Sequence, residues 1–176
     1  AGLAGGVLPF DGFLARLAVE WENAAREAGN ERVRVVLLRI GAVLDSAGGM
    51  LPRLVSPVRA GFGGRLGSGR QYVPWIHGAD LARAILFVLD QPAIEGPVNA
   101  VAPDPPTQSQ FIAALSRVLG KPARLPVPAF ALRLLLGRKA EIVLASQRAV
   151  PNALRAAGFR FEYGDLDAAL ADLVRS

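Results

Sequence analysis

The sequence predicts an α/β fold that reads as the second half of a doubly wound parallel sheet, followed by a helical tail. Residues 32–40 (RVRVVLLRI) form a nearly continuous run of β-branched residues and leucine, which is typical of a parallel strand covered on both faces. Helical patterns flank this run, and the sequence from residue 124 onward reads as short helices separated by proline and glycine. Because one parallel strand needs neighbours and few other strands are visible, we expect part of the sheet to lie outside this sequence.

The first helix is expected over residues 11–28, and Gly29 is its expected end. Apolar residues recur there at helical spacing and would share one face; they are Leu14, Leu17, Trp21 and Ala25. The strand at 32–40 follows and is expected to end in a glycine-bearing loop. Because ligands of open α/β sheets gather beyond the carboxyl ends of strands, residues 39–43 of this loop are candidate ligand contacts.

The middle of the chain is expected to contain a loop, a helix and a short strand. Residues 61–71 are rich in glycine and precede a short extended segment at 72–76. Asp80 is expected at the N-terminus of the next helix, where a negative charge is favourable. One row of that helix would carry Leu81, Ile85 and Leu89. Pro97 then leads into a strand expected at 98–102.

Another helix has clear boundary signals, because Thr107 and Gln110 have the spacing of a capping box and Gly120 is a typical helix end. Its apolar stripe consists of Phe111, Leu115 and Val118.

Two or three helices are expected between residues 124 and 157, separated by Pro128, Gly137 and Pro151. Residues 159–163 (FRFEY) alternate like a strand, with Phe159, Phe161 and Tyr163 on one face. The last helix would bury Leu166, Leu170 and Leu173.

Composition excludes several classes of protein. The 176 residues are 52% apolar, enough for the core of one domain or of a domain with a lobe. There is no apolar run of about 20 residues that could span a membrane, and the first residues lack a signal-peptide pattern. Without cysteine, and with a single histidine, neither disulfides nor a metal site are expected. We therefore expect a soluble cytoplasmic protein.

The net charge is +5, and arginine supplies 18 of the 20 basic residues. These arginines are spread along the chain and form no basic run, so nucleic-acid binding is not expected. Two interpretations stay open: arginine-rich solvated surfaces, or a few arginines that contact phosphate groups.

The order of the segments resembles the C-terminal half of extended, atypical short-chain dehydrogenases, the NAD-dependent epimerase/dehydratase family. Three segments carry this resemblance: RVVLLRIGAVL, GSGRQYVPWIHGADLARAILFVLD and GPVNAVAPDPPTQSQFIAALSRVLGKP. The tail LPVPAFALRLLLGRKAEIVLASQRAVPNALRAAGFRF further resembles the sugar-nucleotide-epimerase-like subfamily, which carries a DUF1731-type C-terminal domain of unknown function. The resemblance implies the C-terminal part of a Rossmann-like doubly wound parallel sheet plus a mostly helical substrate lobe. Residues 1–121 would form the core and lobe, and residues 122–176 the C-terminal domain.

The resemblance also implies a nicotinamide cofactor, NADP or NAD, in the full-length parent. Such proteins hold the pyrophosphate on a G-x-G-x-x-G turn between the first strand and helix. The sequence lacks this motif, since Gly61 and Gly63 are followed by Leu66 where glycine or alanine is needed, and the next glycine pair is followed by Tyr72. We therefore expect a partial protein that lacks its dinucleotide-binding motif and binds little or no cofactor alone.

Catalysis in this superfamily uses a tyrosine, whose pKa of about 10 is lowered by a lysine four residues later. Neither Tyr72 nor Tyr163 has a lysine at that spacing. By the resemblance, Ala18 occupies the tyrosine position and Glu22 the lysine position. No catalytic residue is therefore assigned from the sequence.

Arg70 is the first candidate for substrate binding, because the resemblance places it where related sugar-nucleotide enzymes contact a substrate phosphate. A guanidinium group suits that geometry. Arg65 in the same loop and His77 are further candidates. The alternatives are a carboxylate partner for each arginine, and a bond to the backbone for the histidine.

The cofactor contacts implied by the resemblance are Arg39, Ile40, Gly41 and Val43, a turn that runs past the nicotinamide chiefly through backbone atoms. Gly41 would allow the chain to approach a ring closely. A plain turn between a strand and a loop is the alternative.

Three functions stay open. The first is a partial NAD(P)-dependent epimerase/dehydratase-like oxidoreductase acting on a nucleotide-sugar-like or other small phosphorylated or carboxylated substrate. The second is a non-catalytic NADP-binding sensor, and the third is an interaction module that pairs through exposed strand edges. A small-molecule substrate is the expected partner, and a homodimer is one role for the arginine-bearing helices after residue 124.

Overall fold

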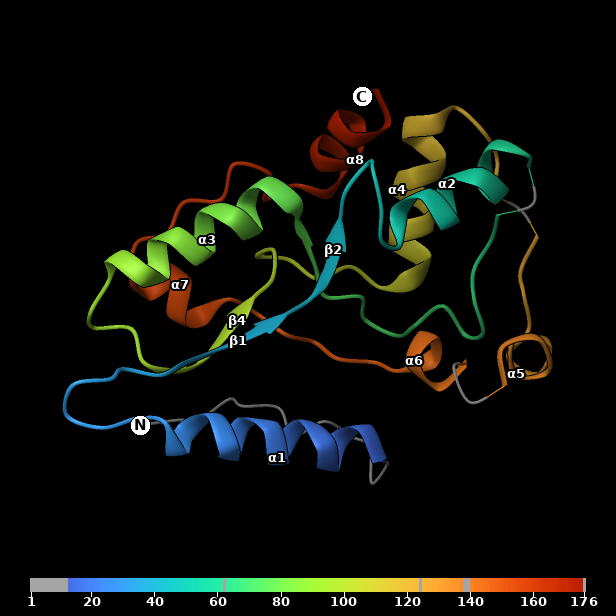
Figure 1. Cartoon of the computed structure of the whole chain (residues 1–176). Helices are drawn as coiled ribbons and strands as arrows, with labels where there is room; N and C mark the ends of the chain where they lie inside the picture. The colour runs from blue at the N-terminus through green and yellow to red at the C-terminus, as the bar shows by residue number, and fades with distance from the viewer. Residues whose placement is uncertain (1–12, 62, 124, 138–139, 176) are drawn as a thin grey trace.

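The computed structural model describes residues 13–61, 63–123, 125–137 and 140–175, and Figure 1 shows how their helices and strands are arranged. The helices are α1 (Phe13–Glu27), α2 (Leu51–Arg59), α3 (Gly78–Asp90), α4 (Gln108–Leu119), α5 (Ala129–Leu136), α6 (Ala140–Leu144), α7 (Asn152–Ala156) and α8 (Leu166–Arg175). The strands are β1 (Val36–Ile40), β2 (Ala42–Leu44), β3 (Trp75–His77) and β4 (Gly96–Ala100).

The strands form two parallel pairs, β1 with β4 and β2 with β3. Gly41 separates β1 from β2, so one continuous stretch pairs first with β4 and then with β3. In this register Arg39 lies opposite Asn99, and Val43 lies opposite Ile76. Parallel strands joined through a helix, here α3 between β3 and β4, define an α/β fold. The predicted fold class is confirmed.

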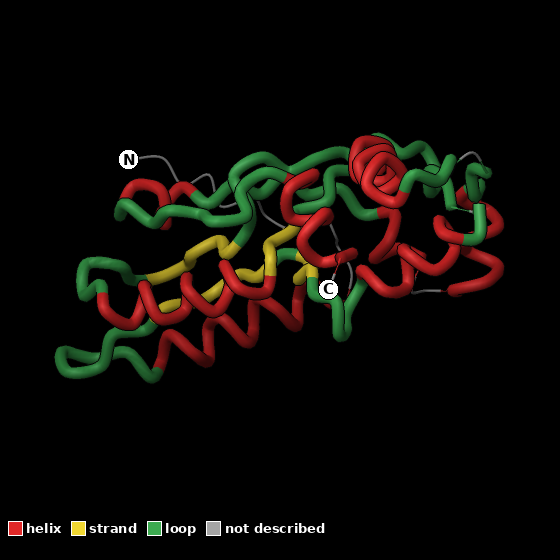
Figure 2. Tube along the Cα trace, turned by 90° about the horizontal axis from the view of Figure 1, so that it is seen from above, coloured by secondary structure: helices red, strands yellow, loops and turns green. Residues whose placement is uncertain are grey.

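Helices α3 and α7 cover one face of the β1–β4 pair, and α1 lies on the other side (Figure 1). Successive strand residues point to opposite faces. Val36 and Leu38 therefore pack with Val88 of α3 and Leu154 of α7, whereas Arg39 points the other way and reaches Glu22 of α1. Figure 2 shows the strands at one end of the molecule and most of the short helices at the other.

A second core lies where β2 and β3 meet α2, α4 and α8. Its fully buried side chains include Trp75, Phe111, Leu115 and Leu170. The last helix thus completes a core that the middle of the chain begins. The domain boundary after residue 121 stays a prediction.

The helix signals read from the sequence are confirmed. The Thr107 side chain accepts a hydrogen bond from the Gln110 amide, and the Gln110 side chain accepts one from the Thr107 amide, so the capping box is complete. Gly120 ends α4 in the left-handed conformation with φ of 61°. Three helices, α5 to α7, follow in the expected region, and α8 buries Leu170 and Leu173.

The strand expected at 32–40 is shorter than predicted. β1 begins at Val36, because Asn30 and Val33 pair with each other in a tight turn before it. Ile40 is 50% exposed. The loop expected from residue 39 onward is also wrong, because after Gly41 the chain forms a second strand, β2, which ends at Leu44.

Helix α2 was not predicted, because two prolines in LPRLVSPVR suggest a loop. A proline in the first helical turn is favourable, since the amide it lacks would have no partner there. Pro57 lies inside the helix and is unfavourable. The burial of Leu51 and Val58 in the second core accounts for a helix at this position.

Residues 159–163 are not a strand, in contrast to the prediction. The backbone amides of Glu162 and Tyr163 donate to the Asp80 carboxylate at 3.0 and 2.8 Å, so a side chain takes the place of a neighbouring strand. Phe159 and Phe161 still pack edge to face, with their ring centroids 4.9 Å apart.

The predicted apolar rows of two helices do not form the buried faces of those helices. Trp21 of α1 is 68% exposed and Leu89 of α3 is 66% exposed. The buried row of α3 lies one position earlier along the helix and consists of Asp80, Ala84 and Val88. Apolar spacing located these helices correctly but did not indicate which side faces a core. Residues 11 and 12 of the first predicted helix lie outside the described residues.

Candidate functional site

Four segments meet at the carboxyl end of the β1–β4 pair, where ligands of open α/β sheets gather. Arg39 donates from Nε and Nη2 to both carboxylate oxygens of Glu22, at 2.7 and 2.8 Å, and so ties β1 to α1. Asn99 lies opposite Arg39, and its amide nitrogen donates to the Val150 carbonyl at 3.1 Å. The segment that follows α6 is thereby fixed to the end of β4.

Glu22 stays ionised at neutral pH. Its hydrogen bond with Arg39 is the main cause that lowers the pKa of its carboxyl group, and the positive charges of Arg39 and Arg26 add to the effect. An ionised carboxylate held by two arginines is a poor proton donor. The position that the resemblance assigns to a lysine therefore holds an ion pair.

Tyr163 does not fit the missing acid–base role. The pKa of Tyr163 is raised, chiefly by the negative charge of Asp172 and further by desolvation. That is the opposite of the shift that such catalysis requires. Ala18 has no titratable group.

The implied cofactor turn contains one glycine with a packing role. A Cβ on Gly41 would lie 2.8 Å from the Pro74 carbonyl oxygen and 2.9 Å from Cγ1 of Val101. Close contact between chain segments therefore already explains this glycine. Val43 is partly buried in β2, whereas Ile40 presents an apolar side chain to solvent. Cofactor contact by the four residues of this turn stays a prediction.

The glycine-rich loop is not a phosphate cradle. A Cβ on Gly63 would overlap Val58, one on Gly64 would overlap the Leu125 carbonyl, and one on Gly69 would overlap the Ser109 hydroxyl. These glycines allow close packing within the protein. Packing within the protein therefore accounts for these three glycines without a ligand.

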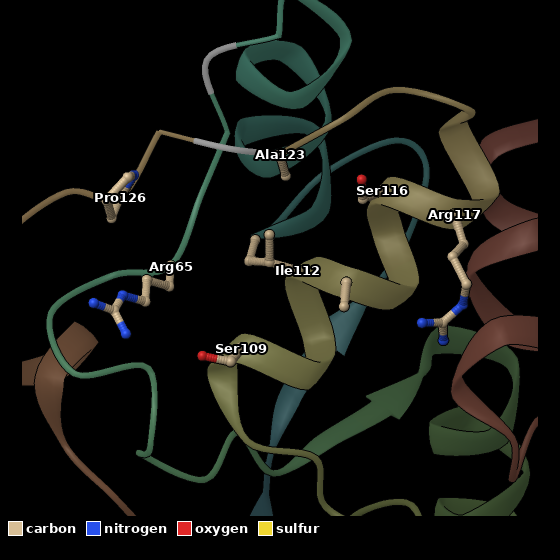
Figure 3. Close-up of a pocket in the computed structure, with 8 residues that line it drawn as sticks. Arg65, Ser109, Ile112, Ser116, Arg117, Ala123 and Pro126 are labelled. Carbon is tan, nitrogen blue, oxygen red and sulfur yellow. The ribbon is translucent and has the colours of Figure 1, made fainter.

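A shallow groove of about 540 Å³ runs along α4 (Figure 3). It is lined by Arg65, Ser109, Ile112, Ala113, Ser116, Arg117, Ala123 and Pro126. Arg65 and Ser109 approach its lower end in the figure from the loop and from the helix, while Arg117 turns away to bind Asp167 at 2.8 Å. Within the described ranges, the guanidinium of Arg65 has no carboxylate partner. Such a groove can receive the acidic end of a small molecule.

Arg70 is exposed, and no described side chain pairs with its guanidinium. Its backbone amide donates to the Ser68 hydroxyl at 3.3 Å, which orders the loop before Tyr72. The guanidinium of Arg148 lies over the Tyr72 ring, 5.5 Å from its centroid. In the sequence, Arg148 is one of the arginines of the segment after residue 124, and no local pattern there indicates its contact with Tyr72.

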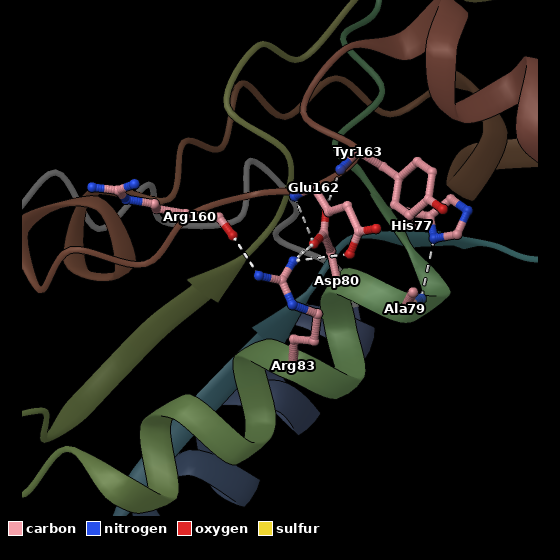
Figure 4. Close-up of polar contacts among 7 residues, drawn as sticks. All are labelled: His77, Ala79, Asp80, Arg83, Arg160, Glu162 and Tyr163. Carbon is pink, nitrogen blue, oxygen red and sulfur yellow. Dashed lines mark hydrogen bonds and ion pairs between the residues drawn. The ribbon is translucent and has the colours of Figure 1, made fainter.

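His77 belongs to a buried cluster instead of an open pocket (Figure 4). Its Nδ1 accepts a hydrogen bond from the Ala79 amide at 3.1 Å and caps α3, and Asp80 lies in the first turn of that helix, as expected. The ring stacks on Tyr163 at 3.8 Å between centroids, and Nε2 lies 3.4 Å from the Asp172 carboxylate. With 5% of its surface exposed, His77 has a structural role here. Substrate contact by His77 stays a prediction.

Asp80 holds the same cluster together. Its fully buried carboxylate accepts hydrogen bonds from the Glu162 and Tyr163 amides and from Nη1 of Arg83, the last at 2.6 Å. Arg83 also donates to the Arg160 carbonyl at 3.0 Å. Three donors satisfy the buried charge, so Asp80 fixes the C-terminal segment to α3.

Two further observations concern ligands and membranes. Nowhere in the part of the chain that the structure describes do three His, Cys, Asp or Glu side chains group as a metal site would require. Across those same residues, every helix is too short or too polar to pass through a bilayer.

Comparison with protein families matches residues 127–173 to a domain of unknown function, DUF1731. The chain is 46% identical over 160 residues to the epimerase family protein Mb2239 of Mycobacterium bovis, covering 90% of this chain and 53% of that protein. It is 41% identical over 168 residues to the epimerase family protein MW0731 of Staphylococcus aureus, covering 96% of this chain and 56% of that protein. The chain thus spans about half the length of the curated relatives it matches.

A solved structure of the human epimerase family protein SDR39U1, determined with NADPH, superposes with a TM-score of 0.89 at 34% identity. The match covers 96% of this chain and 57% of that protein. The resemblance derived from the sequence motifs, including the type of its C-terminal domain, is confirmed.

Proposed function

We propose that this chain, which is similar over almost its whole length to part of several epimerase family proteins, forms the substrate side of an NAD(P)-dependent epimerase/dehydratase-like oxidoreductase. Its substrate would be nucleotide-sugar-like, or another small phosphorylated or carboxylated molecule. The dinucleotide-binding motif would lie outside this sequence, before its first residue. The main support is the meeting of α1, β1, β4 and the segment after α6 at the carboxyl end of the strands.

In this proposal the residues of the chain have separate tasks. Ile40 and the backbone of the neighbouring turn would contact the nicotinamide of NADP or NAD, the group that supplies hydride-transfer chemistry when bound. Arg70 and Arg65 would bind the acidic group of the substrate, since their guanidinium groups are exposed and no carboxylate within the described ranges neutralises them. The Glu22–Arg39 pair would keep α1 in place beside the turn.

Hydride transfer tests this proposal. The chain would be joined to the part of the Staphylococcus aureus relative that it does not cover, and NADPH oxidation would be followed with candidate nucleotide-sugar and keto substrates. We expect turnover that depends on Arg70. Tight NADPH binding without turnover on any substrate would favour a second function.

That second function is a non-catalytic NADP-binding protein, such as a sensor. The specific observation in its favour is the absence of an acid–base pair at the positions implied by the resemblance, where Ala18 has no proton to exchange and Glu22 is held ionised by Arg39. Binding and turnover measured on the same joined protein separate the two functions.

A third function, an interaction module, rests on the apolar side chains that α1 and β1 expose. Val19, Trp21 and Ile40 are all at least half exposed. The half of the family protein outside this sequence would cover them. A homodimer and a cytoplasmic location stay predictions.

A further inference from the structure

Acidic and basic residues are divided unevenly along the chain. Residues 46–79 and 105–140, called the basic region below, contain ten of the 20 basic residues and none of the 15 acidic residues. The rest of the chain contains ten basic and 15 acidic residues, so its net charge is −5, although the whole chain carries +5. A region with this charge balance attracts anionic partners.

The two stretches of the basic region fold against each other. Val58 of α2 lies in the same core as Phe111 of α4. The Gly67 amide donates to the Val127 carbonyl, and the Val127 amide donates to the Arg65 carbonyl, both at 2.9 Å. Figure 1 shows α2, α4 and α5 on the side of the molecule opposite α3 and α7. The fold thus gathers into one part of the molecule the basic residues that are spread along the sequence.

Most exposed arginines of the basic region lack an acidic partner. Arg117 is the exception, since it binds the carboxylate of Asp167 at 2.8 Å. Within the described ranges, no carboxylate pairs with the other exposed arginines of the region, which are Arg53, Arg59, Arg65, Arg70 and Arg133. The region therefore keeps most of its positive charge at the surface.

Helix α5 presents large apolar side chains to solvent within this region. Phe130 is 72% exposed, Leu134 is 84% exposed and Leu135 is 76% exposed, whereas Leu132 is buried. Phe130, Arg133 and Leu134 are spaced by three and four positions, so they share one face of the helix. That face combines two exposed apolar side chains with an arginine.

This combination discriminates between anionic partners. Nucleic acids are bound through phosphate contacts, hydrogen bonds to base edges and stacking on bases, none of which a leucine provides. An anionic bilayer offers phosphate headgroups to arginines and hydrocarbon to apolar side chains. We propose that α5 and the basic region bind the surface of an anionic lipid bilayer, with Phe130 and Leu134 inserted below the headgroups. Such peripheral binding needs no membrane-spanning helix, and it goes beyond the proposed function because neither cofactor nor substrate takes part.

The test measures the binding of the 176-residue chain to lipid vesicles. Sucrose-loaded vesicles of phosphatidylcholine alone, or of phosphatidylcholine and phosphatidylglycerol in equal parts, are sedimented with the chain. We expect binding to the mixed vesicles, little binding to phosphatidylcholine alone, and a loss of binding as sodium chloride is added. A fluorescent DNA duplex in the same buffer should not bind at the protein concentrations that saturate the mixed vesicles.

Substitutions at exposed positions give the matched comparison. Leu134→Gln should weaken binding to the mixed vesicles about tenfold, since one apolar side chain no longer enters the hydrocarbon. Arg133→Gln should weaken it about fivefold, as expected for one basic residue near an anionic surface. The controls are Leu86→Gln on α3, where the leucine is 62% exposed, and Arg155→Gln on α7; each should change binding less than about twofold. Circular dichroism should show the same helix content in all four variants.

Several results would overturn the inference. Equal losses in Leu86→Gln and Leu134→Gln would indicate general adsorption instead of contact through α5. Equal binding to both kinds of vesicle would remove the role of the basic region, and binding to DNA in preference to vesicles would identify nucleic acid as the partner.

The same sedimentation is repeated with the chain joined to the half of its Staphylococcus aureus relative that it does not cover. We expect the joined protein to bind the mixed vesicles and to lose binding in Leu134→Gln. Loss of vesicle binding on joining would show that the added half covers α5, and the inference would fail. None of these outcomes depends on hydride transfer, so the inference and the proposed enzyme activity can fail separately.

Discussion

The Asp80 cluster and the surface around Tyr72 use arginine in opposite ways. In the first, a fully buried carboxylate accepts hydrogen bonds from Arg83 and from two backbone amides, so the charges of Asp80 and Arg83 are paired (Figure 4). In the second, the guanidinium of Arg148 lies over the Tyr72 ring, Arg70 precedes that tyrosine by two residues, and no described carboxylate pairs with either arginine. Both regions bring segments distant in the sequence together, but Arg83 pairs with a buried carboxylate, whereas no described carboxylate pairs with Arg70 or Arg148.

This difference separates structural charges from those available to a ligand. A buried charge must be satisfied by the protein itself, since water cannot reach it. An exposed arginine without a carboxylate costs the fold little and keeps its hydrogen-bonding capacity. Substitutions in the Asp80 cluster should therefore change stability, whereas substitutions of Arg70 or Arg148 should change it little.

The largest expected effect is that of Asp80→Ala. The change leaves two buried amides and one arginine without their acceptor, and should lower the free energy of unfolding by about 3 kcal/mol. Urea denaturation followed by circular dichroism measures the loss. Asp90→Ala, at the exposed end of the same helix, is the control and should stay within about 0.5 kcal/mol. A loss below about 1 kcal/mol for Asp80→Ala would contradict the structural role of the cluster.

Gly69→Ala should produce the next largest effect, about 2 kcal/mol. Gly69 has a positive φ of 69°, and an added Cβ would overlap the Ser109 hydroxyl. Adding Ser109→Ala should restore the part due to overlap and leave about 1 kcal/mol of backbone strain.

Gly158→Ala is the matched control, because Gly158 has a φ of 87° but no atom within 4 Å of an added Cβ. Gly69→Ala combined with Ser109→Ala should therefore lose about as much unfolding free energy as Gly158→Ala. If Ser109→Ala restored none of the stability lost in Gly69→Ala, close packing against Ser109 would not explain the glycine at position 69.

Local signals in the sequence predicted the fold class and most helices. The capping box at Thr107 and the helix end at Gly120 depend on neighbouring residues alone, so the sequence was sufficient to predict both. The strand expected at 159–163 failed because Asp80, about eighty positions earlier in the sequence, takes the backbone donors. Helix α2 was missed for a similar reason, since its stability comes from burial of Leu51 and Val58 in a core formed by distant segments.

The candidate site was predictable to a lesser degree. Motif resemblance singled out Arg65 and Arg70, and both are exposed arginines without a described carboxylate partner. It did not indicate that Glu22 binds Arg39, because that pair joins a helix to a strand across the sheet face. The stacking of Arg148 on Tyr72 is likewise a long-range contact, which composition and periodicity do not indicate.

Glu22→Gln should have a smaller effect, which depends on pH. Arg39 lowers the pKa of Glu22 in the folded protein. The stabilisation is therefore fully present above the unfolded-state pKa of about 4.3, and is lost as the pH falls through the lower folded value. Because the pair is partly exposed, the difference from the unmodified chain should be below about 1 kcal/mol at neutral pH.

Urea titrations at several pH values would measure this difference, with Glu20→Gln as a change of equal charge on the same helix. The difference between Glu22→Gln and the unmodified chain should shrink on acidification. A difference that grows as the pH falls would contradict the assigned sign.

The smallest expected effects on stability are those of Arg70→Gln and Arg148→Gln, each within about 0.5 kcal/mol. The same urea titrations provide the values. A loss of several kcal/mol from either substitution would mean that the arginine supports the fold, and the contrast between the two regions would fail.

The affinity of the 176-residue chain for NADPH tests the central claim, that this chain supplies the substrate side of a dinucleotide-dependent protein without the pyrophosphate cradle. Isothermal titration calorimetry should detect no binding of NADPH to the chain alone at micromolar concentrations. Tight binding should be gained when the chain is joined to the half of its Staphylococcus aureus relative that it does not cover. Submicromolar binding by the chain alone would contradict the account.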